Sequence, residues 1–96
     1  MKGKVALITG GGSGIGFRLA EIFLRHQCTV VIASRSCGRV TEAADYLRSV
    51  VGGDCHPIAF DVRNEDAVDA AFNEILNIYG RIDILVNGHC NYCVFE

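Results

Sequence analysis

A glycine-rich segment, residues 10–16, constrains the fold of this chain more than any other feature. It follows residues 4–9, an apolar run rich in β-formers that predicts a fully buried parallel strand. It leads into residues 14–26, where apolar side chains recur at helical spacing. A strand, a glycine loop and a helix in this order predict the first unit of a parallel α/β sheet. The helix side chains that we expect to face the sheet are Ile15, Leu19, Ile22 and Phe23.

The same alternation continues along the rest of the chain. Further strands are predicted at residues 29–33, 56–60 and 82–86. Helical patterns lie between them, at residues 39–51 and after Asn64, which is placed to cap its helix. Gly52-Gly53 and Gly80 are expected to end these two helices. Their predicted buried faces comprise Val40, Ala43, Ala44, Leu47, Val68, Ala71, Phe72 and Ile75.

Strands that alternate with helices form a parallel sheet, because each right-handed crossover places its helix on one face. The predicted fold is therefore α/β, an incomplete Rossmann-type doubly wound sheet with about four strands in the order 3-2-1-4 and about three helices. The first two helices are expected on one face and the third on the other. The strand at residues 82–86 would then be an exposed edge, which favours homo-oligomers or aggregation.

Composition and charge exclude several classes of protein. Half of the 96 residues are hydrophobic and only one is proline, which excludes a disordered or collagen-like chain. The formal charge is −2 and no segment gathers Lys or Arg, so we expect neither nucleic acid nor anionic membrane as a partner. The apolar runs are too short to span a bilayer and residues 1–4 lack the apolar core of a signal peptide, which predicts a soluble intracellular protein.

The cysteines are odd in number and irregular in spacing, so we expect free thiols. They are Cys28, Cys37, Cys55, Cys90 and Cys93. Cys90 and Cys93 beside His89 could form a redox dithiol or half of a zinc site, and chance spacing is the alternative. No second cysteine pair accompanies them, so no metal site is predicted.

Each glycine of the loop has a physical role in binding a dinucleotide. Gly10 permits a tight turn off the strand, Gly14 lets the backbone approach a pyrophosphate, and Gly16 allows close packing of helix on strand. Unpaired N–H groups at the start of the helix attract the anion, and Ser13 adds a hydroxyl donor. An ordinary glycine-rich turn is the alternative. A P-loop is excluded because no Lys-Ser or Lys-Thr pair follows the glycines.

The end of the second strand favours NADP(H) over NAD(H). An acidic residue there would bind the free ribose hydroxyls of NADH, but this chain has Ser34-Arg35. A guanidinium offers a planar fork of donors to a 2′-phosphate, although Arg35 could also be an ordinary solvated charge. Asp61 follows the third strand at the same edge, where it could accept a hydrogen bond from the adenine amino group or act as a helix-preceding cap.

Two segments resemble the short-chain dehydrogenase/reductase family. Residues 9–16 match its pattern of Thr, Gly, three residues, Gly, any residue, Gly, and residues 80–87 match its fourth strand. Residues 14–26 and 31–36 are similar to the dienoyl-CoA reductase branch of that family. The resemblance implies NADPH-dependent reduction of a conjugated dienoyl-CoA in the breakdown of unsaturated fatty acids, and a peroxisomal location.

The resemblance also implies roles for individual residues. The pyrophosphate would lie on residues 10–15, the adenosine phosphate on residues 35–39, and the adenine beside Asp61. The predicted cofactor-binding residues are Gly10, Gly11, Gly12, Ser13, Gly14, Ile15, Gly16, Ser34, Arg35, Ser36, Arg39, Asp61, Val62 and Asn87. The residues expected near acyl-CoA are Arg35, Arg63 and Tyr92.

The chain departs from the family pattern after the fourth strand, where residues 87–92 read Asn-Gly-His-Cys-Asn-Tyr. No tyrosine is followed by a lysine four residues later, so no Tyr–Lys proton-transfer pair and no catalytic residue is predicted. We expect residues 1–87 to be an NAD(P)-binding half-domain and residues 88–96 a divergent tail. Acyl-CoA would bind only if the missing catalytic half were present.

Three hypotheses follow from these features. The chain is part of a catalytic reductase, or a short product that binds NADPH or a full-length relative without catalysis, or a nonfunctional fragment. Its last residues lack a peroxisomal Ser-Lys-Leu type ending, which leaves a cytoplasmic location as the alternative.

Overall fold

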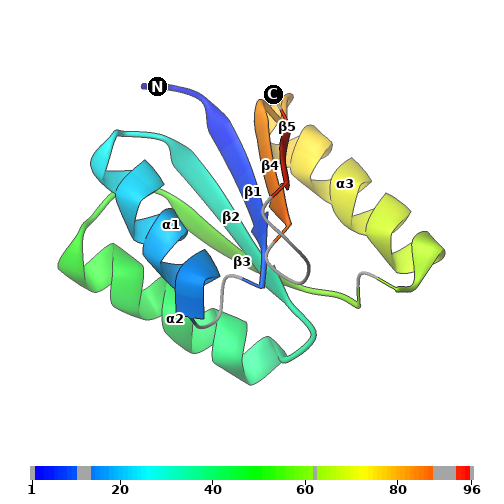
Figure 1. Ribbon diagram of the computed structural model, residues 1–96. Coiled ribbons are helices and arrows are strands. Elements are labelled where there is room, and N and C mark those ends of the chain that lie inside the picture. Colours follow the sequence, from blue (N-terminus) through cyan, green and yellow to red (C-terminus); the bar gives the residue numbers. More distant parts are fainter. Residues whose placement is uncertain (1, 11–13, 62, 88–92, 96) are drawn as a thin grey trace.

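Strand β1 lies at the centre of a five-stranded sheet whose order is β3-β2-β1-β4-β5 (Figure 1). The computed structural model describes residues 2–10, 14–61, 63–87 and 93–95. The strands are β1 (Val5–Thr9), β2 (Thr29–Ser34), β3 (Cys55–Ala59), β4 (Ile84–Asn87) and β5 (Cys93–Phe95). Strands β1 to β4 are mutually parallel, which confirms the predicted order 3-2-1-4.

Helices cover both faces of the sheet as predicted. Helices α1 (Gly14–Arg25) and α2 (Cys37–Val50) lie on one face, and α3 (Glu65–Tyr79) lies on the other (Figure 1). One hydrophobic cluster therefore joins the sheet to α1 and α2, and a second joins it to α3. All five residues of β1 are buried, because the strand has a neighbour on each side and helices on both faces. Among the described residues, no helix is both long and apolar enough to cross a bilayer.

The expectation that the fourth strand is an exposed edge is wrong. Strand β5 pairs antiparallel with β4, with Leu85 opposite Phe95 and Asn87 opposite Cys93. The outer strands of the described sheet are therefore β3 and β5. The sequence pattern missed β5 because it has only three residues, fewer than a periodicity can identify. The homo-oligomers or aggregation expected through a free edge of β4 are therefore not supported, because β5 pairs with that edge.

The predicted sheet-facing side of α1 is also partly wrong. The buried residues of α1 are Gly16, Ala20 and Leu24, while Ile15 and Ile22 are 58 % and 47 % exposed. Small side chains at every fourth position let the helix lie close to the sheet, and this close approach turns the larger isoleucines outward. Leu19 and Phe23 are partly buried beside that stripe, as expected.

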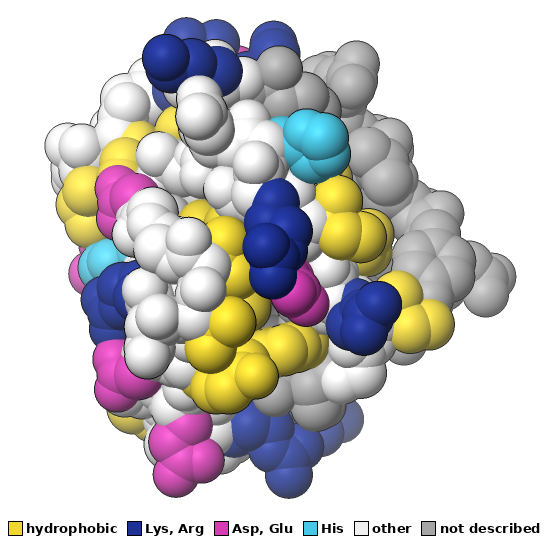
Figure 2. Space-filling model, turned by 90° about the vertical axis from the view of Figure 1, so that its left-hand side faces the viewer, with side chains coloured by type: hydrophobic (Ala, Val, Ile, Leu, Met, Phe, Trp, Pro, Cys, Tyr) yellow, Lys and Arg dark blue, Asp and Glu magenta, His cyan; other side chains and the backbone are white. Residues whose placement is uncertain are grey.

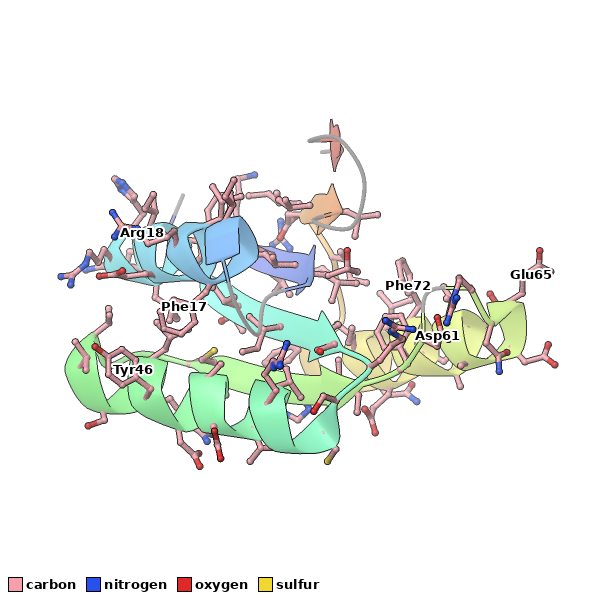
Figure 3. The ribbon with its side chains drawn as sticks, turned by 60° about the horizontal axis from the view of Figure 1, so that its bottom comes forward. Phe17, Arg18, Tyr46, Asp61, Glu65 and Phe72 are labelled. Atoms are coloured by element: carbon pink, nitrogen blue, oxygen red, sulfur yellow. The ribbon has the colours of Figure 1, made fainter. Side chains whose placement is uncertain are left out.

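A hydrophobic area remains on the outer side of the α1 and α2 layer. Phe17 of α1 lies against Tyr46 of α2, with ring centroids 5.8 Å apart and the rings tilted by 38° (Figure 3). Figure 2 shows hydrophobic side chains near the middle of this side, with acidic and basic side chains around them in mixed order. Side chains of both charges therefore surround the hydrophobic area on this side.

The predicted buried faces of the other two helices and the predicted ends of α3 are confirmed. Val40, Ala43, Ala44 and Leu47 of α2 are buried, as are Ala71 and Ile75 of α3, and Val68 and Phe72 pack beside the latter. Asn64 caps α3 by accepting a hydrogen bond from the Ala67 N–H at 3.1 Å. Gly80 ends that helix in the left-handed conformation, at φ 79°. Helix α2 begins two residues earlier than predicted, because Ser36 is its N-cap.

Asp83 joins the first and fourth strands at their amino ends. Its carboxylate accepts a hydrogen bond from the Val5 N–H at 2.8 Å, and its own N–H donates to the Val5 carbonyl at 2.8 Å. Arg81 donates two further bonds to the same carboxylate. These bonds lower the pKa of Asp83, with the Arg81 contribution the largest and the Val5 bond next. The carboxylate therefore connects segments that lie 78 residues apart in the chain.

We expect Asp83→Ala to lower the melting temperature at pH 7 by about 5 °C, because it removes the hydrogen-bond acceptor of Val5. A carboxyl with a lowered pKa stabilises the fold above its ordinary pKa of 3.8, and this contribution is lost as the pH falls below that value. Thermal melts of the wild type and the variant should therefore converge toward pH 3. Asp69→Ala, at an exposed position in α3, is the control. Equal losses in the two variants at pH 7 would contradict the assigned role of Asp83.

Candidate functional site

The register of the sheet brings the ends of the four parallel strands to one edge. Thr9 pairs with Ala33 on one side and with Asn87 on the other. The Thr9 hydroxyl donates to the Val86 carbonyl at 3.3 Å, and the Gly10 N–H donates to the Ala33 carbonyl at 2.7 Å. The chain therefore leaves the sheet at Gly10 between two neighbouring strands. Predicted site residues from β1, β2, β3 and β4 consequently share this carboxyl edge.

Both described ends of the glycine loop adopt backbone conformations that favour glycine. Gly10 has φ 73°, where the chain turns off β1, and Gly14 has φ 63°, where α1 begins. Apart from its chain neighbours and the backbone of its own helix, no atom of the described residues lies within 4 Å of the position that a Cβ of Gly14 would occupy. Ile15 is exposed in the first turn of α1 and Gly16 is buried within the helix. Gly11, Gly12 and Ser13 lie outside the described residues.

The segment after β2 places two guanidinium groups and a helix start at the same edge. The Ser36 N–H donates to the Ser34 hydroxyl at 3.2 Å, and the Ser36 hydroxyl accepts from the Arg39 N–H at 3.3 Å. The second bond caps α2, a role that the sequence analysis missed, although a serine before a helical pattern is a known start signal. Arg35 and Arg39 are both exposed to solvent.

Asp61 follows β3 and is held by Arg63. The Phe60 N–H donates to the Ser34 carbonyl at 3.0 Å, which keeps the ends of β2 and β3 together. The Arg63 guanidinium donates to both carboxylate oxygens of Asp61, from Nε at 3.2 Å and from Nη2 at 3.1 Å. Figure 3 shows Asp61 before the start of α3, near which Glu65 lies. Asn64 caps that helix, so Asp61 is not the capping residue.

The ion pair with Arg63 keeps Asp61 charged. Hydrogen bonds from the Arg63 side chain and main chain lower the pKa of Asp61 to about 2, and the positive charge of Arg35 adds to the effect. The segments after β2 and β3 thus bring three guanidinium groups, those of Arg35, Arg39 and Arg63, to the described part of this edge, and only that of Arg63 is bonded to the Asp61 carboxylate.

The remaining predicted site residues are placed only in part. Asn87 ends β4, where its main chain pairs with Thr9. Val62 and Tyr92 lie outside the described residues, as do His89 and Cys90. Cys28 and Cys55 are buried, and burial raises the pKa of Cys55 to about 11, which makes its thiolate scarce near neutral pH. Within the described ranges, no group of three or more His, Cys, Asp or Glu side chains could hold a metal ion.

Comparison with known families and structures agrees with this arrangement. A family model described as short chain dehydrogenase matches residues 4–91. Peroxisomal 2,4-dienoyl-CoA reductase from Pongo abelii is 56 % identical over 87 residues, which is 91 % of this chain. L-sorbose reductase from Gluconobacter frateurii, solved with NADPH and L-sorbose, is 37 % identical with a TM-score of 0.89. RhlG from Pseudomonas aeruginosa, solved with NADP, is 32 % identical with a TM-score of 0.84.

The match covers only part of each similar protein. The chain spans 30 % of the length of the Pongo abelii reductase. The similarity to the two solved structures covers 95 % and 92 % of this chain and 35 % of each of those chains. The compared region is therefore about a third of each of those proteins.

Replacing Ser36 by Ala should destabilise the protein by about 1 kcal/mol, since the N–H groups at the start of α2 lose their acceptor. In a domain of this size that corresponds to a melting temperature lower by roughly 4–8 °C. Ser49→Ala, at an exposed position near the other end of α2, is the matched control and should change stability little. A Ser36→Ala variant as stable as the control would show that the cap contributes nothing.

Proposed function

This chain belongs to the short-chain dehydrogenase family, and on that premise we propose that it is the NADPH-binding portion of a reductase that resembles 2,4-dienoyl-CoA reductase. The observation that carries the proposal is the exposed Arg35 directly after β2, at the edge where Gly10 and Gly14 turn the chain into α1. A dinucleotide would lie along this edge with its pyrophosphate at the N-terminus of α1.

The charge distribution at the edge supports a phosphorylated cofactor. The whole chain has a formal charge of −2, but Arg35, Arg39 and Arg63 make the described part of this edge positive. Asp61 is paired with Arg63 and so repels a nearby phosphate less than a bare carboxylate would. A 2′-phosphate on the adenosine ribose would find donors here, whereas the free hydroxyls of NADH would find no acidic acceptor directly after β2.

The substrate proposal rests on the similarity to the reductase named above. When bound, NADPH supplies a hydride, and the residues of this chain would hold the cofactor rather than transfer a proton. Arg35, Arg63 and Tyr92 would lie near the phosphate-rich end of an acyl-CoA. The catalytic residues, and the rest of the acyl-CoA pocket, would come from a portion of the enzyme that corresponds to the unmatched part of the relatives. A peroxisomal location belongs to the same proposal.

A second candidate is binding without catalysis, by a short product that holds NADPH or pairs with a full-length relative. The feature that favours it is the lack of a Tyr–Lys pair anywhere in the 96 residues. An assay of dienoyl-CoA-dependent NADPH oxidation tests the placement of the catalytic residues, which both candidates locate outside this chain. We expect no oxidation by the chain alone, and measurable turnover would overturn the assignment of the catalytic residues to another portion.

NADPH should stabilise the purified chain. At a free concentration of about 100 times the Kd, a ligand that binds only the folded state adds about 2.7 kcal/mol, which corresponds to a melting temperature higher by roughly 10–20 °C. Thermal melting followed by circular dichroism measures this shift, with 2′-phosphate-free NADH at the same concentration as the comparison. A sharp melt that NADPH leaves unchanged would refute the proposed function.

Exchanging Arg35 for Asp should weaken NADPH by more than tenfold and change NADH binding much less. The substitution removes a donor and places a negative charge beside the 2′-phosphate, while the acid could accept bonds from the ribose hydroxyls of NADH. Titration calorimetry with both cofactors gives the two affinities. Lys2→Asp, which makes the same charge change at an exposed site near the other end of β1, is the control. Equal losses for both cofactors would count against a phosphate at Arg35.

A further inference from the structure

Arg63 and Asp61 act as one unit at the edge of the site. We propose that Arg63 is a positioning residue, which fixes the Asp61 carboxylate so that a single acceptor position is offered to the amino group of an adenine. This inference rests on the proposed function, because it concerns how the adenosine end of the same dinucleotide is recognised. It gives Arg63, which does not itself touch the base, a role in the selection of adenine over other bases.

The hydrogen bonds between the two residues leave little of the carboxylate unused. Oδ1 accepts from the Arg63 main-chain N–H at 2.9 Å and from Nε at 3.2 Å, and Oδ2 accepts from Nη2 at 3.1 Å. An ionised carboxylate has about four lone-pair positions. The three donors of Arg63 occupy both positions of Oδ1 and one of Oδ2. Among the described donors none takes the remaining position, on Oδ2, which we assign to a donor from a ligand.

Main-chain hydrogen bonds hold the backbone at Asp61 and at the residue before it. The Asn64 N–H donates to the Asp61 carbonyl at 3.0 Å, which closes a turn between β3 and α3. The N–H of Phe60, the residue before Asp61, donates to the Ser34 carbonyl at the end of β2. With the backbone held at both sides, the remaining freedom of Asp61 is the rotation of its side chain. The Arg63 guanidinium restricts that rotation, because its Nε and Nη2 groups donate to the two carboxylate oxygens at once.

The Asp61 side chain is 35 % exposed, so a ligand can reach it, and the Arg63 side chain is 74 % exposed. An exposed ion pair of this kind contributes little to stability, so the role we assign to Arg63 concerns the direction of the acceptor and not the stability of the fold. An adenine amino group donates to that acceptor. Hypoxanthine has a carbonyl oxygen at the same position and would meet the carboxylate oxygen with no proton between them.

A matched pair of residues exists near the opposite edge of the sheet. Arg81 also donates through Nε and Nη2 to an aspartate two residues away, at 3.0 and 2.7 Å. That aspartate, Asp83, holds the Val5 N–H and belongs to the fold rather than to the site. Arg81→Ala therefore removes the same two guanidinium donors as Arg63→Ala, although both of its bonds go to one oxygen, Oδ1, and it does so at a place where no adenine is proposed to bind.

The test compares NADPH with reduced nicotinamide hypoxanthine dinucleotide phosphate by titration calorimetry on the full chain. We expect the wild type and Arg81→Ala to prefer NADPH by roughly tenfold, the factor that one hydrogen bond to a charged acceptor gives. Arg63→Ala should weaken both dinucleotides through the loss of a positive charge, but NADPH by more, so that the preference falls to about twofold. Arg63→Lys keeps the charge but not the planar fork, and it should restore the preference only in part.

Each outcome separates this inference from the proposed function. A wild type that binds neither dinucleotide would overturn the proposed function, and the inference with it. A preference in Arg63→Ala equal to or greater than that of the wild type would refute positioning by Arg63 while leaving NADPH binding intact. Equal weakening of both dinucleotides would show a merely structural role. Nuclear magnetic resonance of the Asp61 carboxyl provides a check in solution, since its pKa of about 2 should rise toward 3.8 in Arg63→Ala.

Discussion

The burial of β1 on both faces and along both edges is the constraint on which the rest of the structure depends. Its main chain is paired with β2 on one side and with β4 on the other, and all five of its side chains are buried. A chain that leaves such a strand must turn at once, which Gly10 does at φ 73°. Strands β2 and β3 lie on one side of β1 and β4 lies on the other. The turn at Gly10 is therefore at the point of the sheet where the connections change side. In doubly wound sheets this is where ligands bind.

Two Arg–Asp pairs with the same spacing serve different purposes at the two ends of the strands. Arg81 and Asp83 lie at the amino ends, where the carboxylate also binds the main chain of Val5 and so connects distant segments. Arg63 and Asp61 lie at the carboxyl ends, and the hydrogen bonds to this carboxylate come from Arg63 alone among the described donors. The first carboxylate is committed to the fold, whereas the second keeps an acceptor position for a ligand.

The sequence predicted those features that depend on local periodicity and turn chemistry. The buried faces of α2 and α3 and the ends at Asn64 and Gly80 follow from patterns within about 15 residues, whereas strand order follows from the alternation of strands and helices along the chain. The exposure of Ile15 and Ile22 did not follow, because the distance of α1 from the sheet is set by small residues that no hydrophobicity pattern ranks highly. The position of the candidate site, at the carboxyl edge of the sheet, could be predicted from where the strands end. The ion pair between Arg63 and Asp61 could not, because it depends on the geometry of the turn after β3, which hydrophobic periodicity does not specify.

Net charge is a poor guide to what such an edge can bind. The acidic side chains that give the chain its formal charge of −2 lie largely on helix surfaces, as with Asp45 of α2 and Asp69 of α3. The guanidinium groups of Arg35 and Arg63, in contrast, follow the carboxyl ends of β2 and β3, where the chain first reaches solvent after a strand. A phosphate within a few ångströms of those groups interacts with them more strongly than with acidic side chains beyond a screening length of about 8 Å. Under the proposed function, the adenosine half of the dinucleotide is thus recognised by the first three strands and their loops. Cofactor binding can therefore be separated physically from the chemistry at the nicotinamide.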